Sequence, residues 1–295
     1  MPLILLCTLL LTADPEDYQL SLLTRYPLDC PVCNLNFITV ACTQSNTRGG
    51  IDRDLFPRAI GPQPEFYRIS TCPRCGYSGY DTDFDPRLVL PPDVTSRILQ
   101  NPKLPLPPDF GPQSDPRELD ASVRYDLAIR CYTWRQKSDE ALAWLNLRAA
   151  WVARDSGSVL PRDERLARVL RYIERYRPLL EPGGNQLDVE MQLATRVAEA
   201  LALGDFNRYQ RPYVELALAL ILRRHGENRQ AAPILERLSG DPVFEPPMQE
   251  AIDRMRESIH TERRYQKQAA DYFERALLAD SIEPANRGAA CYLLG

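Results

Sequence analysis

Lysine and histidine are scarce in this sequence of 295 residues. It contains only three lysines and only two histidines, His225 and His260. With so few imidazoles, catalysis of the Ser-His or Cys-His type has few possible general bases. Basic charge is carried almost entirely by arginine, and the formal net charge is −4. That balance argues against a general affinity for nucleic acid, which usually appears as a basic domain.

Apolar runs long enough to cross a membrane are not evident either. The run at residues 3–11 is too short to span a bilayer. It is long enough for the hydrophobic region of a secretory signal, although no lysine or arginine precedes it. We therefore expect residues 1–13 to be a signal peptide and the protein to be exported to the periplasm. The alternative is a buried N-terminal strand or helix in a cytoplasmic protein.

Four of the eight cysteines give the strongest signal in the sequence. Cys30 and Cys33 form one Cys-Pro-x-Cys pair, and Cys72 and Cys75 form a second. Each pair can place two thiolates on one tight turn, and two such turns supply the four ligands of a closed tetrahedral zinc site. We therefore predict one structural Zn²⁺ bound by these four thiolates.

The neighbours of the cysteines favour the same interpretation. A proline follows the first cysteine of each pair and stiffens the turn by fixing φ. The residue after each second cysteine must often take a positive φ so that nearby amides can point at the sulfurs. Gly76 adopts that conformation freely, and Asn34 is the next best choice.

A thiol-dependent redox protein is the competing interpretation of the two pairs. Redox Cys-x-x-Cys motifs usually open a helix, whereas residues 65–71 are expected to be an extended segment that leads into the second pair. The 38 residues between the pairs exceed the common spacing in zinc sites and require a long insertion. Cys131 and Cys291 lie in helical patterns, and we expect both to be buried and neither to bind metal.

Five aspartates lie in two clusters near the cysteine pairs. They are Asp52, Asp54, Asp81, Asp83 and Asp85. Alternating acidic residues can indicate a calcium site, but the glycine and the distal glutamate of an EF-hand loop are missing. We expect solvated loops in which the aspartates cap short helices.

Composition divides the chain into four stretches. After residues 1–13, the segment 14–85 contains both cysteine pairs and is predicted to be a small β, zinc-ribbon-like module. Residues 86–118 hold nine of the 26 prolines and are predicted to be a surface linker. Apolar residues recur with helical spacing over 119–295. The predicted fold class is mainly α, with a small β zinc module followed by an α-helical repeat domain.

The helical part carries the pattern of tetratricopeptide-like repeats. Ala219 and Ala231 are small residues that would let two antiparallel helices approach closely, and Gly226 would make the turn between them. A second pair of helices is expected within residues 247–277, and a third unit from Gly288.

Repeat domains of this type bind partners on an inner face. The first helix of the repeat is expected at residues 211–224. It would present five side chains to a protein or peptide partner: Tyr213, Leu216, Leu220, Arg223 and Arg224. Such a set could hold an amphipathic segment and pair with its acidic groups. The alternative is that the leucines pack on the preceding helix, at residues 186–203, and that the arginines are merely solvated.

The whole arrangement resembles a bacterial family of uncharacterised proteins, catalogued as domain of unknown function 2225. The resemblance rests on Cys-Pro-Val-Cys at residues 30–33, Pro-Arg-Ala-Ile-Gly-Pro at 57–62 and Cys-Pro-Arg-Cys-Gly-Tyr at 72–77, together with the helices downstream. It covers most of residues 25–295 and implies a zinc-knuckle module fused to tetratricopeptide-type helices. It implies no activity. We therefore expect a non-enzymatic zinc-binding scaffold with a protein or peptide partner, without nucleic-acid binding.

Overall fold

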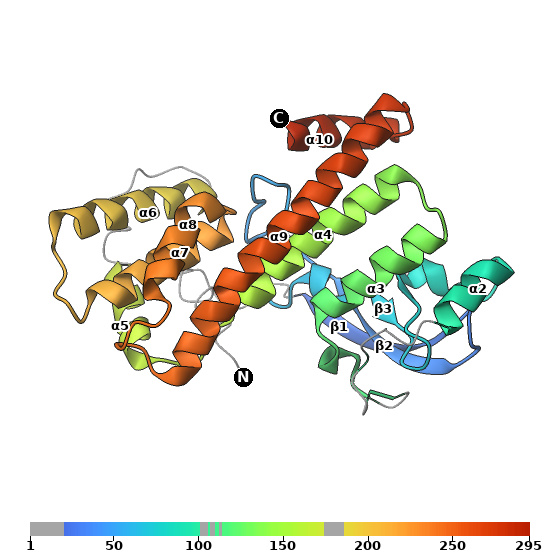
Figure 1. The fold of residues 1–295 in the computed structure, drawn as a ribbon, viewed down its shortest axis with the longest axis horizontal. Helices are drawn as coiled ribbons and strands as arrows, with labels where there is room; N and C mark the ends of the chain where they lie inside the picture. The colour runs from blue at the N-terminus through green and yellow to red at the C-terminus, as the bar shows by residue number, and fades with distance from the viewer. Residues whose placement is uncertain (1–20, 101–105, 107–109, 112–113, 174–185) are drawn as a thin grey trace. The chain divides into compact units, whose positions relative to one another are not determined.

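A computed structural model describes residues 21–100, 106, 110–111, 114–173 and 186–295 (Figure 1). The described chain is mainly α-helical with a small β part near its N-terminal end, as predicted. The segment expected to be a signal peptide lies outside the described residues. Within the described residues, none of the helices is both long enough and apolar enough to span a membrane.

Packing contacts divide the chain into two compact units. Unit 1 contains residues 46–61 and 153–261, and unit 2 contains residues 20–45, 62–152 and 262–295. The division falls inside two helices, each of which contributes to both units. The domain boundaries expected from composition stay a prediction, because packing contacts do not test independent folding.

The β part of unit 2 consists of two short antiparallel hairpins. Strand β1 (Leu22–Asp29) pairs with β2 (Asn36–Gln44), and β3 (Ser70–Thr71) pairs with β4 (Ser78–Gly79). The extended segment expected over residues 65–71 is mostly wrong. A 3₁₀ helix, η2 (Pro64–Tyr67), takes its place and leaves only two residues of strand. Pro64 lies in the first turn of η2, where its fixed φ suits a helix and its missing N–H costs nothing.

The helices of unit 2 follow the second hairpin. The short ones are η3 (Asp81–Phe84), α2 (Pro92–Leu99) and η4 (Pro116–Glu118). The longer ones are α3 (Ala121–Trp134), the first part of α4 (Asp139–Gly157), the last part of α9 (Pro246–Leu278), and α10 (Pro284–Leu294). Ser138 caps α4 as its sequence predicts, since its hydroxyl accepts a hydrogen bond from the amide of Ala141 at 3.2 Å.

Unit 1 is built from the remaining helices. They are α5 (Glu164–Ile173), α6 (Gln186–Leu203), α7 (Arg211–Arg224) and α8 (Asn228–Leu238), with the ends of α4 and α9. Helices α7 and α8 form the predicted hairpin. Gly226 makes its turn with φ of 73°, and the side chains of Ala219 and Ala231 are completely buried. Small residues thus allow close contact between these two helices.

The second helix pair expected within residues 247–277 is not formed. The segment is part of one continuous helix, α9, and Gly288 lies inside α10 instead of starting a new unit. Residues 261–270 contain no glycine or proline and are rich in good helix formers, so nothing in the local sequence ends the helix there. Among the residues that the structure describes, there is therefore one hairpin of the expected kind, not a series.

Asp52 is the centre of a buried charge network in unit 1. Its carboxylate accepts hydrogen bonds from Arg58 Nη2 at 2.6 Å and from Arg154 Nη1 at 3.1 Å. Arg58 also pairs with Asp155 at 2.6 Å, and Arg154 pairs with Asp54. Burial raises the pKa of Asp52 in spite of these guanidinium groups. The expected solvated loop is therefore wrong here: Asp52 is 3% exposed, and it holds a loop to α4.

Asp83 plays the equivalent part in unit 2. Its carboxylate accepts hydrogen bonds from the Tyr132 hydroxyl at 2.6 Å, Arg135 Nη1 at 2.7 Å and the amide of Tyr80 at 3.0 Å. Asp83 is also buried, so the expectation of a solvated loop fails for it as well. The expected capping role is confirmed, because its bond from the Tyr80 amide caps η3. Asp85, in contrast, pairs only with the exposed Arg87.

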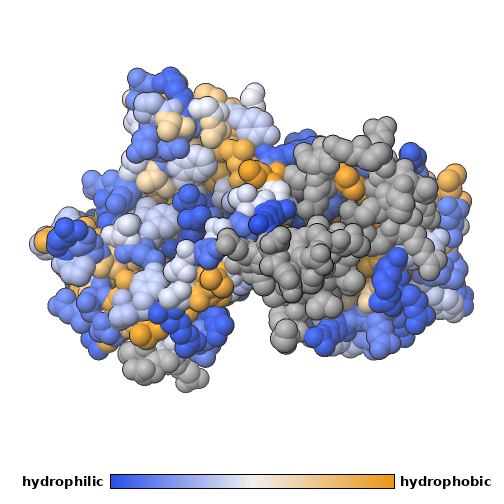
Figure 2. All heavy atoms as spheres, turned by 180° about the vertical axis from the view of Figure 1, so that it is seen from behind, coloured by the Kyte–Doolittle hydropathy of each residue, from blue (hydrophilic) through white to orange (hydrophobic). Residues whose placement is uncertain are grey.

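Figure 2 shows one face of the molecule, on which hydrophilic residues cover most of the described surface and hydrophobic residues lie in small separate groups. Scattered apolar side chains of this kind are normal on protein surfaces and do not by themselves indicate a docking face.

The network around Asp52 predicts a large stability effect. We expect Asp52→Asn to lower the free energy of unfolding by about 3 kcal/mol, because two buried guanidinium groups lose a charged partner. Denaturant unfolding monitored by circular dichroism measures the change. Asp205→Asn is the matched control, since Asp205 is exposed in the same unit. Equal midpoints for the two variants would show that the network contributes little.

Candidate metal centre

Both cysteine pairs lie in hairpin loops of the same length. Residues 30–35 connect β1 to β2, where Asp29 faces Asn36. Residues 72–77 connect β3 to β4, where Thr71 faces Ser78 in the same way. Each loop thus begins at the first cysteine of its pair and rests on an antiparallel ladder. The long insertion required by the sequence is the segment that runs from the end of β2 to β3.

The two loops also share their backbone hydrogen bonds. In each, the amide of the first cysteine donates to the carbonyl five residues later, and the amide four residues later donates back to the carbonyl of that cysteine. The four bonds are Cys30 N to Leu35 O at 2.9 Å, Asn34 N to Cys30 O at 2.9 Å, Cys72 N to Tyr77 O at 2.8 Å and Gly76 N to Cys72 O at 2.9 Å. The two loops therefore have the same conformation, and each is called a knuckle below.

The predicted backbone conformation after each second cysteine is confirmed. Asn34 has φ of 54° and Gly76 has φ of 71°. Asparagine tolerates the left-handed region better than most side chains, and glycine enters it at no steric cost. The residue type at this position is therefore what allows the chain to turn around the sulfurs.

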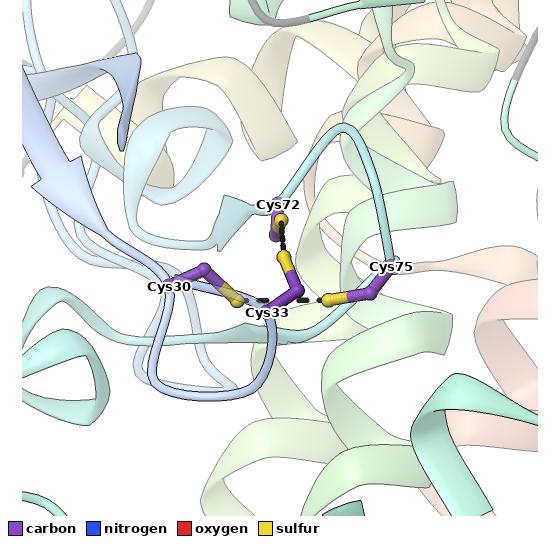
Figure 3. A group of neighbouring side chains, drawn as sticks. All are labelled: Cys30, Cys33, Cys72 and Cys75. Atoms are coloured by element: carbon purple, nitrogen blue, oxygen red, sulfur yellow. Dashed lines mark hydrogen bonds between the residues drawn. The ribbon is translucent and has the colours of Figure 1, made fainter. Parts of the chain in front are cut away.

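The two knuckles bring their sulfurs together. All four Sγ atoms lie within 4.8 Å of one another. Between the knuckles, Cys30 Sγ lies 3.5 Å from Cys75 Sγ, and Cys33 Sγ lies 3.5 Å from Cys72 Sγ (Figure 3). A disulfide has sulfurs about 2.05 Å apart, and all four cysteines are free thiols. A tetrahedral site with bonds of about 2.3 Å has sulfur–sulfur edges of about 3.8 Å. The group could therefore hold a metal ion.

Apolar side chains surround the sulfurs. Cys30 and Cys72 are 1% and 0% exposed. The knuckles share a hydrophobic cluster with α2 and α3, to which Val94, Ile98 and Cys131 contribute. The cluster also includes stacked aromatic rings from the hairpins and η3, in which Phe84 contacts both Phe37 and Tyr77 edge-on. The group of four cysteines is thus part of the core of unit 2.

The four thiols cannot all ionise side by side without a cation. Hydrogen bonds from the Cys30 and Cys75 thiols lower the pKa of Cys72 to about 2, so one thiolate is favoured. The hydrogen bond with Cys72 raises the pKa of Cys30, and the hydrogen bonds with Cys30 and Cys72 raise that of Cys75. A divalent cation removes this mutual repulsion, because each thiolate then has a positive partner.

The other described cysteines do not join the group. Cys131 is buried in α3, as predicted, and burial raises the pKa of its thiol to about 11. Cys42 donates a hydrogen bond to the carbonyl of Gln44 at 3.0 Å. The predicted burial of Cys291 is wrong, because this residue is exposed on α10.

The five side chains predicted to contact a partner are mostly not at the surface. Tyr213, Leu216 and Arg223 are 3%, 0% and 0% exposed, and Leu216 belongs to the same core as side chains of α6. Leu220 is half-buried against that core. Arg224 pairs with Glu190 at 2.9 Å. Leu216 thus packs in one core with the preceding helix, as the alternative expected. The solvated arginines of that alternative are wrong, because Arg223 is buried and Arg224 is paired. Contact with a partner stays a prediction.

Sequence reasoning missed the residues that tie the second knuckle to α3. The Tyr77 hydroxyl donates to the carbonyl of Asp83 at 3.1 Å, and Arg135 Nη1 donates to that hydroxyl at 2.8 Å and to the Asp83 carboxylate at 2.7 Å. The aspartates that follow the knuckle and the arginine after the end of α3 were the available signals. Their pairing could not be read from either segment alone.

The sequence matches a known protein family. The family model described as "Uncharacterized protein conserved in bacteria (DUF2225)" matches residues 23–262, which include both knuckles and most of the helices. The comparisons with curated proteins and with solved structures found no match. The match covers well over half of the sequence, so the chain belongs to this bacterial family of uncharacterised proteins.

Proposed function

We propose that the chain is a non-enzymatic scaffold in which Cys30, Cys33, Cys72 and Cys75 bind one structural Zn²⁺ and the helices bind a protein or peptide partner. The observation that carries the proposal is the convergence of four sulfurs from two equivalent knuckles. Four thiolates in tetrahedral arrangement are a typical zinc ligand set, and iron is the main competitor for it.

A structural role for the metal follows from the closed ligand set. Catalytic zinc sites keep one position for water or substrate, whereas sites with four cysteines use every position for the protein. The surroundings support this assignment, since Cys30 and Cys72 are buried among apolar side chains. Cys33 and Cys75 are only partly buried, but a site with four cysteine ligands would leave no coordination position for a substrate.

The contacts between sulfurs argue against the redox alternative. A Cys-x-x-Cys redox motif forms its disulfide within the motif and needs an accessible thiolate. Here each knuckle contacts the other at 3.5 Å, through Cys30 and Cys75 and through Cys33 and Cys72, so the four sulfurs form one group. The buried first cysteine of each pair is also poorly placed to attack a substrate.

Elemental analysis tests the metal. We expect one zinc per chain in protein purified without chelator, and a content far below one in Cys72→Ser, because three thiolates cannot complete the tetrahedron. Cys291→Ser is the matched control, since that thiol is exposed and remote from the knuckles in the fold of unit 2. It should keep its zinc. Iron in place of zinc, or equal zinc in both variants, would contradict the assignment.

Hydrogen exchange tests the structural role. We expect removal of the metal by a chelator under reducing conditions to expose the amides of β1, β2 and both knuckles, and to loosen α3, whose Cys131 packs on the knuckles. The amides of α7 and α8 should keep their protection, because these helices belong to the core of unit 1. Unchanged exchange at residues 30–35 after confirmed metal loss would show that the ion is dispensable for folding.

The scaffold role requires a partner that binds stoichiometrically. We expect the full-length zinc-loaded chain to capture one dominant protein from the cells that produce it, and that protein, used as bait, to capture this chain in return. Titration calorimetry of the purified pair should then give a saturable complex. The Cys291→Ser variant serves as a control of intact fold. A candidate that fails the reciprocal capture, or shows no heat of binding, would refute the scaffold role for that pair.

A further inference from the structure

Unit 2 contains a cleft that the metal site does not use. Its volume is about 400 Å³. One face of the first turns of α4 lines it with Ala141, Trp144 and Arg148, and the end of α3 contributes Tyr132. Tyr80, from the segment after the second hairpin, and the start of α10 complete the wall. A cleft of this size suits a small ligand or a single side chain of a peptide.

Hydrogen-bond donors in the wall lack acceptors. Trp144 Nε1 is a buried side-chain nitrogen without a hydrogen-bond partner. Arg148 Nε makes no hydrogen bond either, but it forms an ion pair with the buried Glu65 carboxylate at 3.7 Å, and Arg148 Nη1 donates to the Tyr80 hydroxyl. A buried N–H that makes no hydrogen bond costs about 1–3 kcal/mol, so such a group usually indicates an acceptor that occupies the site at some stage. The Trp144 nitrogen is covered in this structure, so a ligand reaches it only if the indole shifts.

A lysine at the cleft also has unused hydrogen-bonding capacity. The Lys137 ammonium forms an ion pair with Asp83 at 3.7 Å, too far for a hydrogen bond, and lies 5.5 Å from the centroid of the Tyr132 ring. Asp83 is already shared by Arg135 and the Tyr132 hydroxyl. Among the residues that the structure describes, the ammonium makes no hydrogen bond, so its donors remain available to a ligand.

The carboxylates at the cleft decide how much negative charge a ligand can carry. Both oxygens of Glu140 are engaged, by the amide of Glu283 at 3.0 Å and by Asn286 Nδ2 at 2.8 Å. Glu283 itself is exposed at the rim. Two carboxylates so close disfavour a multiply charged group such as phosphate, whereas a single carboxylate can pair with Lys137.

We propose that this cleft binds a carboxylate attached to an aromatic or apolar body. The carboxylate would accept hydrogen bonds from Lys137 and, after a shift of the indole, from Trp144. The body would lie against the rings of Tyr80 and Tyr132, which pack edge-on with centroids 6.2 Å apart. Such a group occurs both in free aromatic acids and at the C-terminal residue of a peptide. This inference does not depend on the metal or on the scaffold role.

The indole N–H resonances of the full-length protein report on this cleft. The chain has three tryptophans, and Trp144→Phe identifies the signal of Trp144. We expect N-acetylphenylalanine to move that signal in a saturable way, and its neutral amide to bind at least tenfold more weakly, because a charge-assisted hydrogen bond is worth about 1.5–3 kcal/mol. Benzoate is the second probe. Tighter binding of benzoate would assign the cleft to free aromatic acids, and tighter binding of N-acetylphenylalanine to peptide C-termini.

Lysine variants separate the proposal from adventitious binding. We expect Lys137→Met to weaken binding of the better probe roughly tenfold or more, with its remaining resonances unchanged as evidence of an intact fold. Lys267→Met removes an exposed lysine of the same unit and should leave the affinity unaltered. Equal affinity for acid and amide, an unaffected Lys137→Met variant, or a Trp144 signal that neither probe moves would overturn the proposal.

Discussion

The convergence of four sulfurs is the constraint on which unit 2 depends. One hairpin has strands of eight and nine residues, and the other has strands of only two. Isolated two-stranded hairpins are marginal in water at best, so neither could hold its loop in place alone. Ligation of both knuckles by one ion would join the hairpins through bonds that an apolar core of this size cannot replace. The packing of Cys131 on the knuckles extends that constraint to α3.

Buried carboxylates also connect separate segments of this fold. Asp83 connects the segment after the second knuckle to α3, and Asp52 connects a loop to α4 within unit 1. Burying charge is costly, so such networks contribute less to net stability than to the choice of one arrangement. In unit 2 the cysteine group and the Asp83 network are connected, because Tyr77 belongs to the second knuckle and its hydroxyl donates to the main-chain carbonyl of Asp83. The cleft wall at Tyr80 and Tyr132 is held by the same carboxylate.

Local signals explain what the sequence could predict. Asn34 and Gly76 indicated the knuckles, and Gly226 indicated the turn between α7 and α8, because a positive φ is a property of single residues. The break expected within residues 247–277 rested only on spacing, and no residue there ends a helix. The burial of Asp52 was out of reach for another reason. It depends on Arg154, which lies 102 positions away. A charged residue is buried only where a partner of opposite charge is available.

The scarcity of lysine acquires a physical meaning from these networks. A guanidinium offers five donors in a rigid plane and can satisfy several buried acceptors at once, whereas an ammonium is a compact and strongly hydrated charge. Arg124 is buried and donates to the carbonyls of Ile69 and Phe66 at 3.1 and 2.6 Å. Arg223 is completely buried and donates to Asn228 and to Ser258. Lysine could not serve two acceptors in these places with the same geometry. Arginine therefore suits a fold that joins its segments through buried charge, and Lys137, at an open cleft, is placed where a hydrated ammonium costs little.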